Sequence, residues 1–265
     1  MSACNTCKDT EKTGVLHIKK AVKRFGGKTV VNVEDIRIGT HCIEGLIGPN
    51  GAGKSTLINL MTQKLSLTEG EIIYYRGDEA INVSSKNLNT LAKLNLVRSN
   101  QIIQDFASLT IVDSMILANT DLRHEKFYKL FNDKEVREAA QEKIDFYLDY
   151  FHFDFPEGHA LSAGEKKLLD IIRCLILNPK FLLLDEPTAG LPQDQSDKVI
   201  DLLQKKTAEE DMCVLIVEHN LDLIWRVCDY IHFMADGQIL IQGTPDEIKG
   251  NETVNKKYIG EESNA

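Results

Sequence analysis

The stretch GPNGAGKST, from Gly48 to Thr56, decides how the whole chain is interpreted. It begins with the phosphate-loop pattern G-x-x-x-x-G-K-[ST]. Glycines let the backbone curl so that successive N–H groups point at a triphosphate. Lys54 can then reach the β- and γ-phosphates, and the Ser55 hydroxyl can hold Mg²⁺. The alternative is a chance glycine-rich turn, but an apolar run of strand length precedes the loop and apolar residues at helical spacing follow it.

The composition limits the class of protein. With 265 residues, of which 43% are apolar and 27% charged, the chain fits one globular domain, or a core with a subdomain. No apolar run approaches the ~20 residues that a membrane span needs, and no signal peptide opens the chain. We therefore expect a soluble, cytoplasmic protein. The net charge of −9 argues against a nucleic-acid-binding surface.

The cysteines fall into two groups. Cys42, Cys174 and Cys213 lie in apolar segments, where a small buried thiol is expected, and a disulfide framework is not. Cys4 and Cys7 form a C-x-x-C pair in the polar opening segment, residues 1–13, which we expect to be a flexible tail. A metal or redox role is the alternative, although one such pair supplies only two of the four ligands of a structural zinc site.

Strand and helix patterns alternate along the chain, which predicts an α/β fold around a parallel sheet. Residues 81–93 look irregular, and residues 110–151 have helical spacing with little strand signal, which predicts a helical insertion. Asp236-Gly237 predicts a hairpin turn, and Thr244 with Glu247 predicts a capping box. The predicted strands are residues 15–20, 29–38, 43–47, 71–75, 94–98, 181–184, 213–217, 230–234 and 238–241, and the predicted later helices cover residues 168–176, 199–205 and 221–228.

A second motif, Asp185-Glu186, ends the apolar run at residues 181–184. Beside a phosphate loop, an aspartate at such a strand end can hold the Mg²⁺ shell. The next carboxylate, Glu186, could polarise a water for in-line attack on the γ-phosphorus. The alternative is an acidic pair that caps a helix.

A third motif, LSAGE, covers residues 161–165. Ser162 could be an N-cap, with Glu165 completing a capping box. It could also belong to a second anion site, with the Ser162 hydroxyl and the Gly164 N–H aimed at a phosphate. Because an acidic side chain near a triphosphate is unfavourable, we expect Glu165 to face its own helix.

The succession GPNGAGKST, LSAGE, FLLLDE and VEH resembles the ATP-binding-cassette ATPases, from about Val15 to Gly260. The resemblance implies a P-loop NTPase core with an antiparallel β subdomain and an inserted helical subdomain. The core would be residues 14–100 and 165–260, and the helical subdomain with its signature would be residues 101–164. It also implies that two such units face each other head to tail with two ATP molecules between them.

The resemblance also implies individual roles. Phe25 would stack on adenine, and Gln101 would contact Mg²⁺ and sense the γ-phosphate. Phe25 could instead be an ordinary turn or core aromatic, and Gln104 is a rival for Gln101. Ser162 and Gly164 would reach the partner's ATP. Asp185 would hold Mg²⁺, and Glu186 would be the catalytic base. His219 would be the switch that contacts the γ-phosphate, unless it is merely structural. The residues covering the phosphates would be Asn50, Gly51, Ala52, Gly53, Lys54, Ser55 and Thr56.

Within the family, FGG, RSNQ, EPTAGL and VEHNLDL look like the ATPases of branched-chain amino-acid importers, while LSAGEK is also similar to urea-importer relatives. The implied partners are membrane permease subunits, a second ATPase subunit (a copy or a paralogue) and, indirectly, an extracytoplasmic solute-binding protein. The chain would work at the cytoplasmic face of the membrane. The alternatives are an exporter ATPase for lipid or drug, a soluble cassette protein of DNA repair or translation, and a non-catalytic nucleotide-binding regulator.

Overall fold

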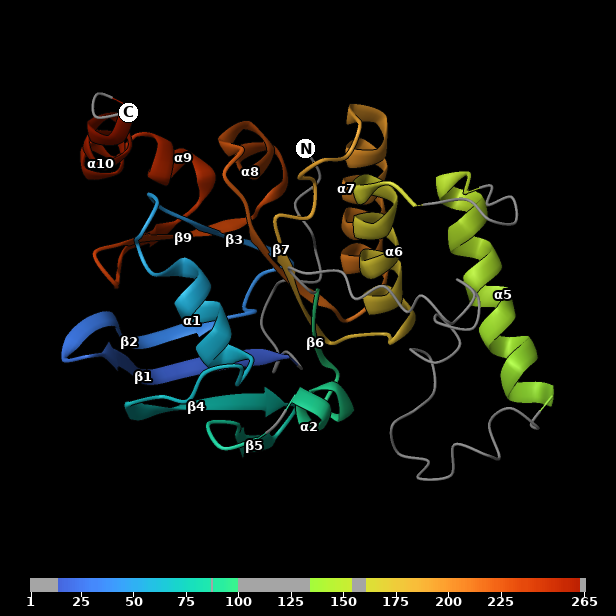
Figure 1. Ribbon diagram of the computed structural model, residues 1–265, viewed down its shortest axis with the longest axis horizontal. Coiled ribbons are helices and arrows are strands. Elements are labelled where there is room, and N and C mark those ends of the chain that lie inside the picture. The colour runs from blue at the N-terminus through green and yellow to red at the C-terminus, as the bar shows by residue number, and fades with distance from the viewer. Residues whose placement is uncertain (1–13, 87, 100–133, 154–160, 263–265) are drawn as a thin grey trace.

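The computed structural model describes residues 14–86, 88–99, 134–153 and 161–262, which form two β-sheets with helices around them (Figure 1). The larger sheet has six strands in the order β10-β9-β3-β8-β7-β6. Neighbours from β9 to β6 run parallel, and β10 runs antiparallel to β9. Its strands are β3 Ile43–Ile47, β6 Leu96–Arg98, β7 Phe181–Asp185, β8 Cys213–Val217, β9 Tyr230–Ala235 and β10 Gln238–Gly243.

The smaller sheet is antiparallel, with four strands in the order β2-β1-β4-β5. Its two long strands form a hairpin that turns at Gly26 and Gly27, whose φ angles of 53° and 86° suit a tight turn. The bounds are β1 Val15–Phe25, β2 Lys28–Ile38, β4 Glu69–Arg76 and β5 Glu79–Asn82.

Two hydrophobic cores lie on opposite faces of the larger sheet. All residues of β3, β7 and β8 are buried, as expected for central parallel strands covered on both faces. Side chains alternate across a strand, so Phe181 and Leu183 enter the core between the two sheets, and Leu182 and Leu184 enter the core on the helix side. Helix α1 packs into the core between the two sheets, and α6, α7 and α8 cover the core on the helix side.

The described helices surround this sheet. Helix α5 stands at one end of the molecule beyond α6 (Figure 1) and reaches the helix-side core through Ile144, Tyr147 and Phe151. No described helix combines the length and the apolar character needed to cross a membrane. The helices are α1 Lys54–Met61, α2 Leu88–Lys93, α5 Lys134–Phe151, α6 Ala163–Ile176, α7 Gln193–Glu209, α8 Leu221–Val227, α9 Pro245–Lys249 and α10 Glu252–Glu262.

Several expectations are confirmed. The fold is α/β with a parallel central sheet. Asp236 and Gly237, with φ angles of 51° and 79°, form the turn between β9 and β10. The cysteines expected to be buried are buried, as is Cys228. Both capping boxes are present, Ser162 with Glu165 and Thr244 with Glu247.

Other expectations are wrong or lie outside the described residues. Residues 81–93 are not irregular, because β5 and α2 occupy much of that range. Strand β5 lies at the edge of the smaller sheet with three of its four residues exposed, so it lacks the alternation that marks a half-buried strand. The 1–13 tail and most of the 101–164 insertion fall outside the described residues, and the subdomain boundaries stay predictions.

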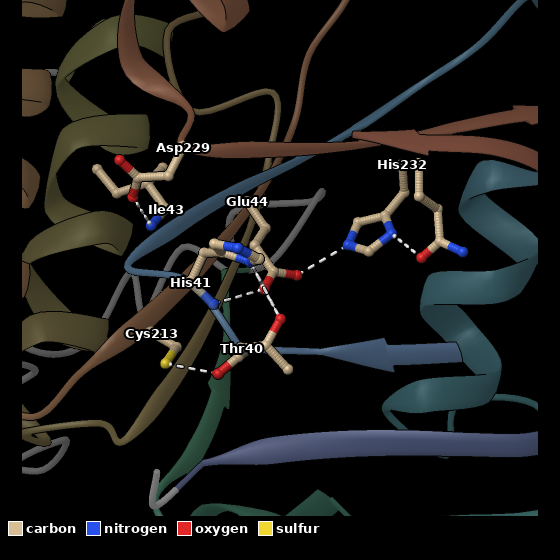
Figure 2. Close-up of polar contacts among 9 residues, drawn as sticks. Thr40, His41, Ile43, Glu44, Cys213, Asp229 and His232 are labelled. Carbon is tan, nitrogen blue, oxygen red and sulfur yellow. Dashed lines mark hydrogen bonds and ion pairs between the residues drawn. The ribbon is translucent and has the colours of Figure 1, made fainter. Parts of the chain in front are cut away.

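Figure 2 shows a buried polar cluster that joins β3, β9 and β10. Glu44 is 1% exposed and His232 0%. The Nε2 atom of His232 pairs with Oε2 of Glu44 at 2.8 Å, and its Nδ1 faces Oε1 of Gln242 at 3.0 Å. The other carboxylate oxygen accepts hydrogen bonds from the His41 N–H at 2.8 Å and the Thr40 hydroxyl at 3.1 Å. Burial alone would raise the pKa of Glu44, but the hydrogen bonds from His232 and His41 outweigh it and hold the pKa well below its ordinary value.

This cluster predicts a large stability cost for removing one partner. His232→Phe should lower the free energy of unfolding at pH 7 by about 3–5 kcal/mol, because it leaves the buried Oε2 atom of the Glu44 carboxylate without its partner. Urea denaturation followed by circular dichroism measures the change. The matched control is His17→Phe, because His17 pairs with the exposed Asp35 and such a pair contributes at most about 1 kcal/mol. Equal costs for the two variants would contradict the role given to the Glu44 pair.

The pH dependence follows from the depressed pKa of Glu44. A carboxylate whose folded pKa lies below its unfolded value, about 4.3, stabilises the fold fully above that pH and loses its contribution as pH falls below it. The stability difference between the wild type and Glu44→Gln should therefore be constant from neutral pH down to about pH 5 and shrink below about pH 4.

Candidate functional site

Three of the sequence motifs meet at one edge of the larger sheet. The phosphate loop follows β3, Asp185-Glu186 ends β7, and Glu218-His219 follows β8. These strands are parallel neighbours in the order β3-β8-β7, so their carboxyl ends share one edge. Ligands of such sheets bind just outside the carboxyl ends of the strands.

Two glycines of the phosphate loop have no room for a side chain. A Cβ on Gly48, which has φ 153°, would lie 1.9 Å from the Met234 carbonyl oxygen. A Cβ on Gly53, which has φ 101°, would lie 2.9 Å from the Val30 carbonyl oxygen. The loop is thus held tightly against β9 and β2, with a backbone conformation that favours glycine.

The loop presents donors at the start of α1. Gly53 is the N-cap of this helix and supplies no side-chain cap, and the N-terminus of a helix favours an anion. The Lys54 ammonium donates to the carbonyl oxygens of Gly48 at 2.5 Å and Pro49 at 3.0 Å, so it lies over the loop. Ser55 and Asn50 are exposed. This donor set fits a phosphate chain.

Asp185, which is 4% exposed, is held through its carboxylate and through its backbone. Its Oδ2 accepts from Nη2 of Arg98 at 3.2 Å. Its backbone N–H donates to the Ser99 hydroxyl at 3.1 Å, and its carbonyl oxygen accepts from the Lys167 ammonium at 2.7 Å. An anchored carboxylate at the same edge of the sheet as the phosphate loop with its exposed Ser55 is a donor set that fits Mg²⁺, which prefers oxygen ligands. Burial lowers the pKa of Arg98, and the Asp185 carboxylate opposes that shift.

Glu186 and His219 face each other across the ends of β7 and β8. The Nε2 atom of His219 lies 3.4 Å from Oε1 of Glu186, and both side chains are partly exposed. Glu186 has a left-handed backbone with φ 51°, unusual for a residue other than glycine, and its N–H donates to the Val217 carbonyl at 2.8 Å. This turn carries the chain from the end of β7 toward the end of β8.

The buried Glu218 joins the two loops that hold this pair. Its Oε1 accepts from the Thr188 hydroxyl at 2.7 Å and the Thr188 N–H at 3.0 Å. Its Oε2 accepts from the His219 N–H at 3.2 Å. Glu218 is 5% exposed, so these bonds are shielded from water.

Phe25 lies at the end of β1 rather than in the turn beyond it, and its side chain is 47% exposed. The hairpin that carries it runs beside the phosphate loop, since Val30 of β2 closes on Gly53. The Lys23 ammonium stands 5.1 Å from the centre of the Phe25 ring. The exposed ring lies on the hairpin that approaches the loop, and its stacking on a base stays a prediction.

Ser162 and Gly164 lie at the start of α6. The Ser162 hydroxyl accepts from the Glu165 N–H at 3.2 Å, and the Glu165 carboxylate accepts from the Ser162 N–H at 2.7 Å. Glu165 therefore faces its own helix, as expected. A Cβ on Gly164 would lie 2.9 Å from the Gly190 carbonyl oxygen, in the loop after Glu186. The hydrogen bonds of Ser162 are made within its own helix, not with the phosphate loop of this chain.

Sequence patterns indicated no role for two residues of this edge, Arg98 and Glu218. Gln101 and its rival Gln104 lie outside the described residues. Arg98 and Glu218 were part of the quoted segments RSNQ and VEH, but nothing local says that they bridge distant elements. A charged residue at the end of an apolar strand is the signal that could have marked both.

Comparisons with known proteins agree with this geometry. The family described as ABC transporter matches residues 35–189, more than half of the chain. The high-affinity branched-chain amino acid transport ATP-binding protein BraF of Pseudomonas aeruginosa is 30% identical over 93% of this chain and 98% of its own length. The protein of the same description named LivG, from Escherichia coli, is 29% identical over the same shares.

Solved structures give the same result. A nucleotide-free ATP-binding cassette from an ABC transporter is 26% identical with a TM-score of 0.74, over 93% of this chain and 99% of that one. An ATP-binding cassette in its ADP conformation is 26% identical with a TM-score of 0.73, over 94% and 99%. The phosphate loop, the paired carboxylates and the parallel sheet that joins them therefore have one common explanation: this chain belongs to the ABC transporter family and has the fold of its ATP-binding cassettes.

Proposed function

We propose that the chain binds and hydrolyses ATP to drive a membrane importer. The observation that carries this proposal is the meeting of the phosphate loop, Asp185, Glu186 and His219 at one edge of one sheet. A pocket for the phosphates, a metal carboxylate and a base are the parts that phosphoryl transfer to water requires.

Each residue has a distinct task in this mechanism. The N–H groups of residues 50–56 and the Lys54 ammonium hold the phosphates, and Phe25 stacks on the adenine. Ser55, Asp185 and Gln101 would hold Mg²⁺, which when bound neutralises charge on the phosphates.

Hydrolysis then uses the pair at the ends of β7 and β8. Glu186 accepts a proton from a water whose oxygen attacks the γ-phosphorus, while the bond from phosphorus to the β–γ bridging oxygen breaks. His219 would contact the γ-phosphate beside Glu186. The 3.4 Å separation of the two side chains supports a role for both at the same phosphate.

The second half of each site comes from another ATPase subunit, a copy or a paralogue. Ser162 is exposed at the start of α6, and its hydroxyl hydrogen is free of the capping bond, in which its oxygen is the acceptor. Ser162 and Gly164 of one subunit would complete the ATP site of the other in a head-to-tail dimer. ATP binding would close this dimer and hydrolysis reopen it.

The relatives BraF and LivG are named for branched-chain amino acid transport, which supports these amino acids as the cargo. The chain would act at the cytoplasmic face of the membrane, bound to permease subunits that receive cargo from an extracytoplasmic solute-binding protein. Nucleic acid is not a partner in this proposal, in keeping with the net charge of −9.

Glu186→Gln tests the catalytic base. Turnover should fall about 10²–10⁴-fold, because the amide cannot accept the proton, while ATP binding persists. Release of inorganic phosphate and equilibrium binding of a fluorescent ATP analogue measure the two effects. The control is Glu142→Gln, an exposed glutamate of α5, which should leave turnover unchanged. Near-normal turnover of Glu186→Gln would remove the base from the mechanism.

Mixing two inactive variants tests the head-to-tail dimer. Lys54→Ala removes the ammonium group that binds the phosphates. Ser162→Asp keeps a good N-cap for α6 but places a negative charge against the triphosphate bound by the partner subunit. Each variant alone should be inactive. Their mixture should regain activity, because a heterodimer contains one site with an intact Lys54 from one subunit and an intact Ser162 from the other.

Ser162→Asn is the matched control, since it caps the helix equally well without charge and should retain most activity. Sites completed within one subunit would leave the mixture inactive, and that outcome would exclude the shared arrangement.

Reconstitution tests the cargo. The chain is reconstituted in lipid vesicles with its permease subunits, and release of inorganic phosphate is measured. The rate should rise when the solute-binding protein carries leucine, isoleucine or valine, and should not rise when urea is supplied. The physical reason is that a loaded binding protein favours the permease state that closes the ATPase dimer. A response to urea alone would assign the chain to the other importer branch.

A further inference from the structure

A buried arginine links the two sides of the proposed metal site. Arg98 ends β6 and its side chain is 4% exposed. Its Nη1 donates to Oδ1 of Asn59 at 2.7 Å and to the Thr62 hydroxyl at 3.0 Å. Its Nη2 donates to Oδ2 of Asp185 at 3.2 Å. One guanidinium therefore holds α1 and its C-cap with one nitrogen and the end of β7 with the other.

The two elements that Arg98 joins carry the two expected metal ligands. Helix α1 begins with Lys54 and Ser55, and Asn59 lies on the same short helix. Strand β7 ends in Asp185. Since an eight-residue helix is stiff, its position at Asn59 fixes the position of Ser55 at its other end.

The arrangement is a poor source of stability. A buried ion pair seldom repays the cost of removing both charges from water. In addition, the buried Nε–H of Arg98 has no hydrogen-bond acceptor among the described residues, and an unpaired buried donor is unfavourable. A role in the reaction explains the arginine better than a role in folding.

We propose that Arg98 is a positioning residue that fixes the separation of Ser55 and Asp185, and through it the binding of Mg²⁺ with ATP. The proposal rests on the proposed function, which gives Ser55 and Asp185 to the metal. The rigid fork of the guanidinium, not only its charge, is what the position needs: a lysine ammonium is a point charge that cannot span two elements in the same way.

Arg98→Lys tests this directly, because it keeps the positive charge and removes the fork. The measurement is the dissociation constant of ATP, by isothermal titration calorimetry, once with Mg²⁺ and once with EDTA. Mg²⁺ should tighten ATP binding by the wild type, and this gain should fall about 10–100-fold in Arg98→Lys, the usual effect of losing a residue that orients a metal ligand. Binding in EDTA should change less than about twofold, because the loop donors are untouched.

Removing the contacts of Arg98 on the α1 side provides an independent variant. Asn59→Ala combined with Thr62→Val removes the α1 contacts of Arg98 without changing any charge. It should also reduce the gain from Mg²⁺ while leaving binding in EDTA intact. A full gain from Mg²⁺ in either Arg98→Lys or this double variant would overturn the proposal. Urea denaturation of each variant verifies that it is folded.

Two further variants separate this proposal from the proposed function. Asp185→Asn should abolish the gain from Mg²⁺, and Lys54→Ala should weaken ATP binding in EDTA by about 10–100-fold, the cost of a charge-assisted hydrogen bond. If either fails, the proposed function is at fault. If both hold while Arg98→Lys keeps the full gain from Mg²⁺, the proposal for Arg98 alone is overturned and the proposed function stands.

Discussion

The parallel pairing of β3, β8 and β7 is the constraint on which the rest of the structure depends. In the pairing register, Val217 lies opposite both Leu46 and Asp185, so the carboxyl ends of the three strands agree to within one residue across the sheet. Because side chains alternate between faces, a slip of one residue in any of these strands would turn its apolar residues to the wrong core. The hydrophobic cores thereby determine where the phosphate loop, the paired carboxylates and His219 meet.

Local patterns made the main parts of this site predictable. The phosphate loop requires glycines at fixed spacing, and Gly48 and Gly53 indeed sit where a Cβ would strike the backbone of Met234 and Val30. The central strands were recognisable as short apolar runs, and the cap of α6 by Ser162 and Glu165 was readable from their spacing. These features depend on neighbours in sequence, so a single sequence contains them.

Features that depend on long-range contacts could not be predicted in the same way. Arg98 is 87 positions from Asp185, and Glu44 is 188 positions from His232. The sequence around Arg98 or Glu44 contains no pattern that indicates which distant residue it contacts. Strand β5 was missed for a related reason, since it is held by its pairing with β4 and has no buried face of its own to produce a pattern. Tertiary context, not local preference, forms these elements.

Helix α6 touches the segment that contains Glu186 at two places. Lys167 donates to the carbonyl oxygen of Asp185, immediately before Glu186, and Gly164 lies against the carbonyl oxygen of Gly190, shortly after it. The backbone before Glu186 and the loop after it are therefore both in contact with residues near the start of α6. A shift of this helix would move the backbone that carries the carboxylate proposed to accept the proton of the attacking water.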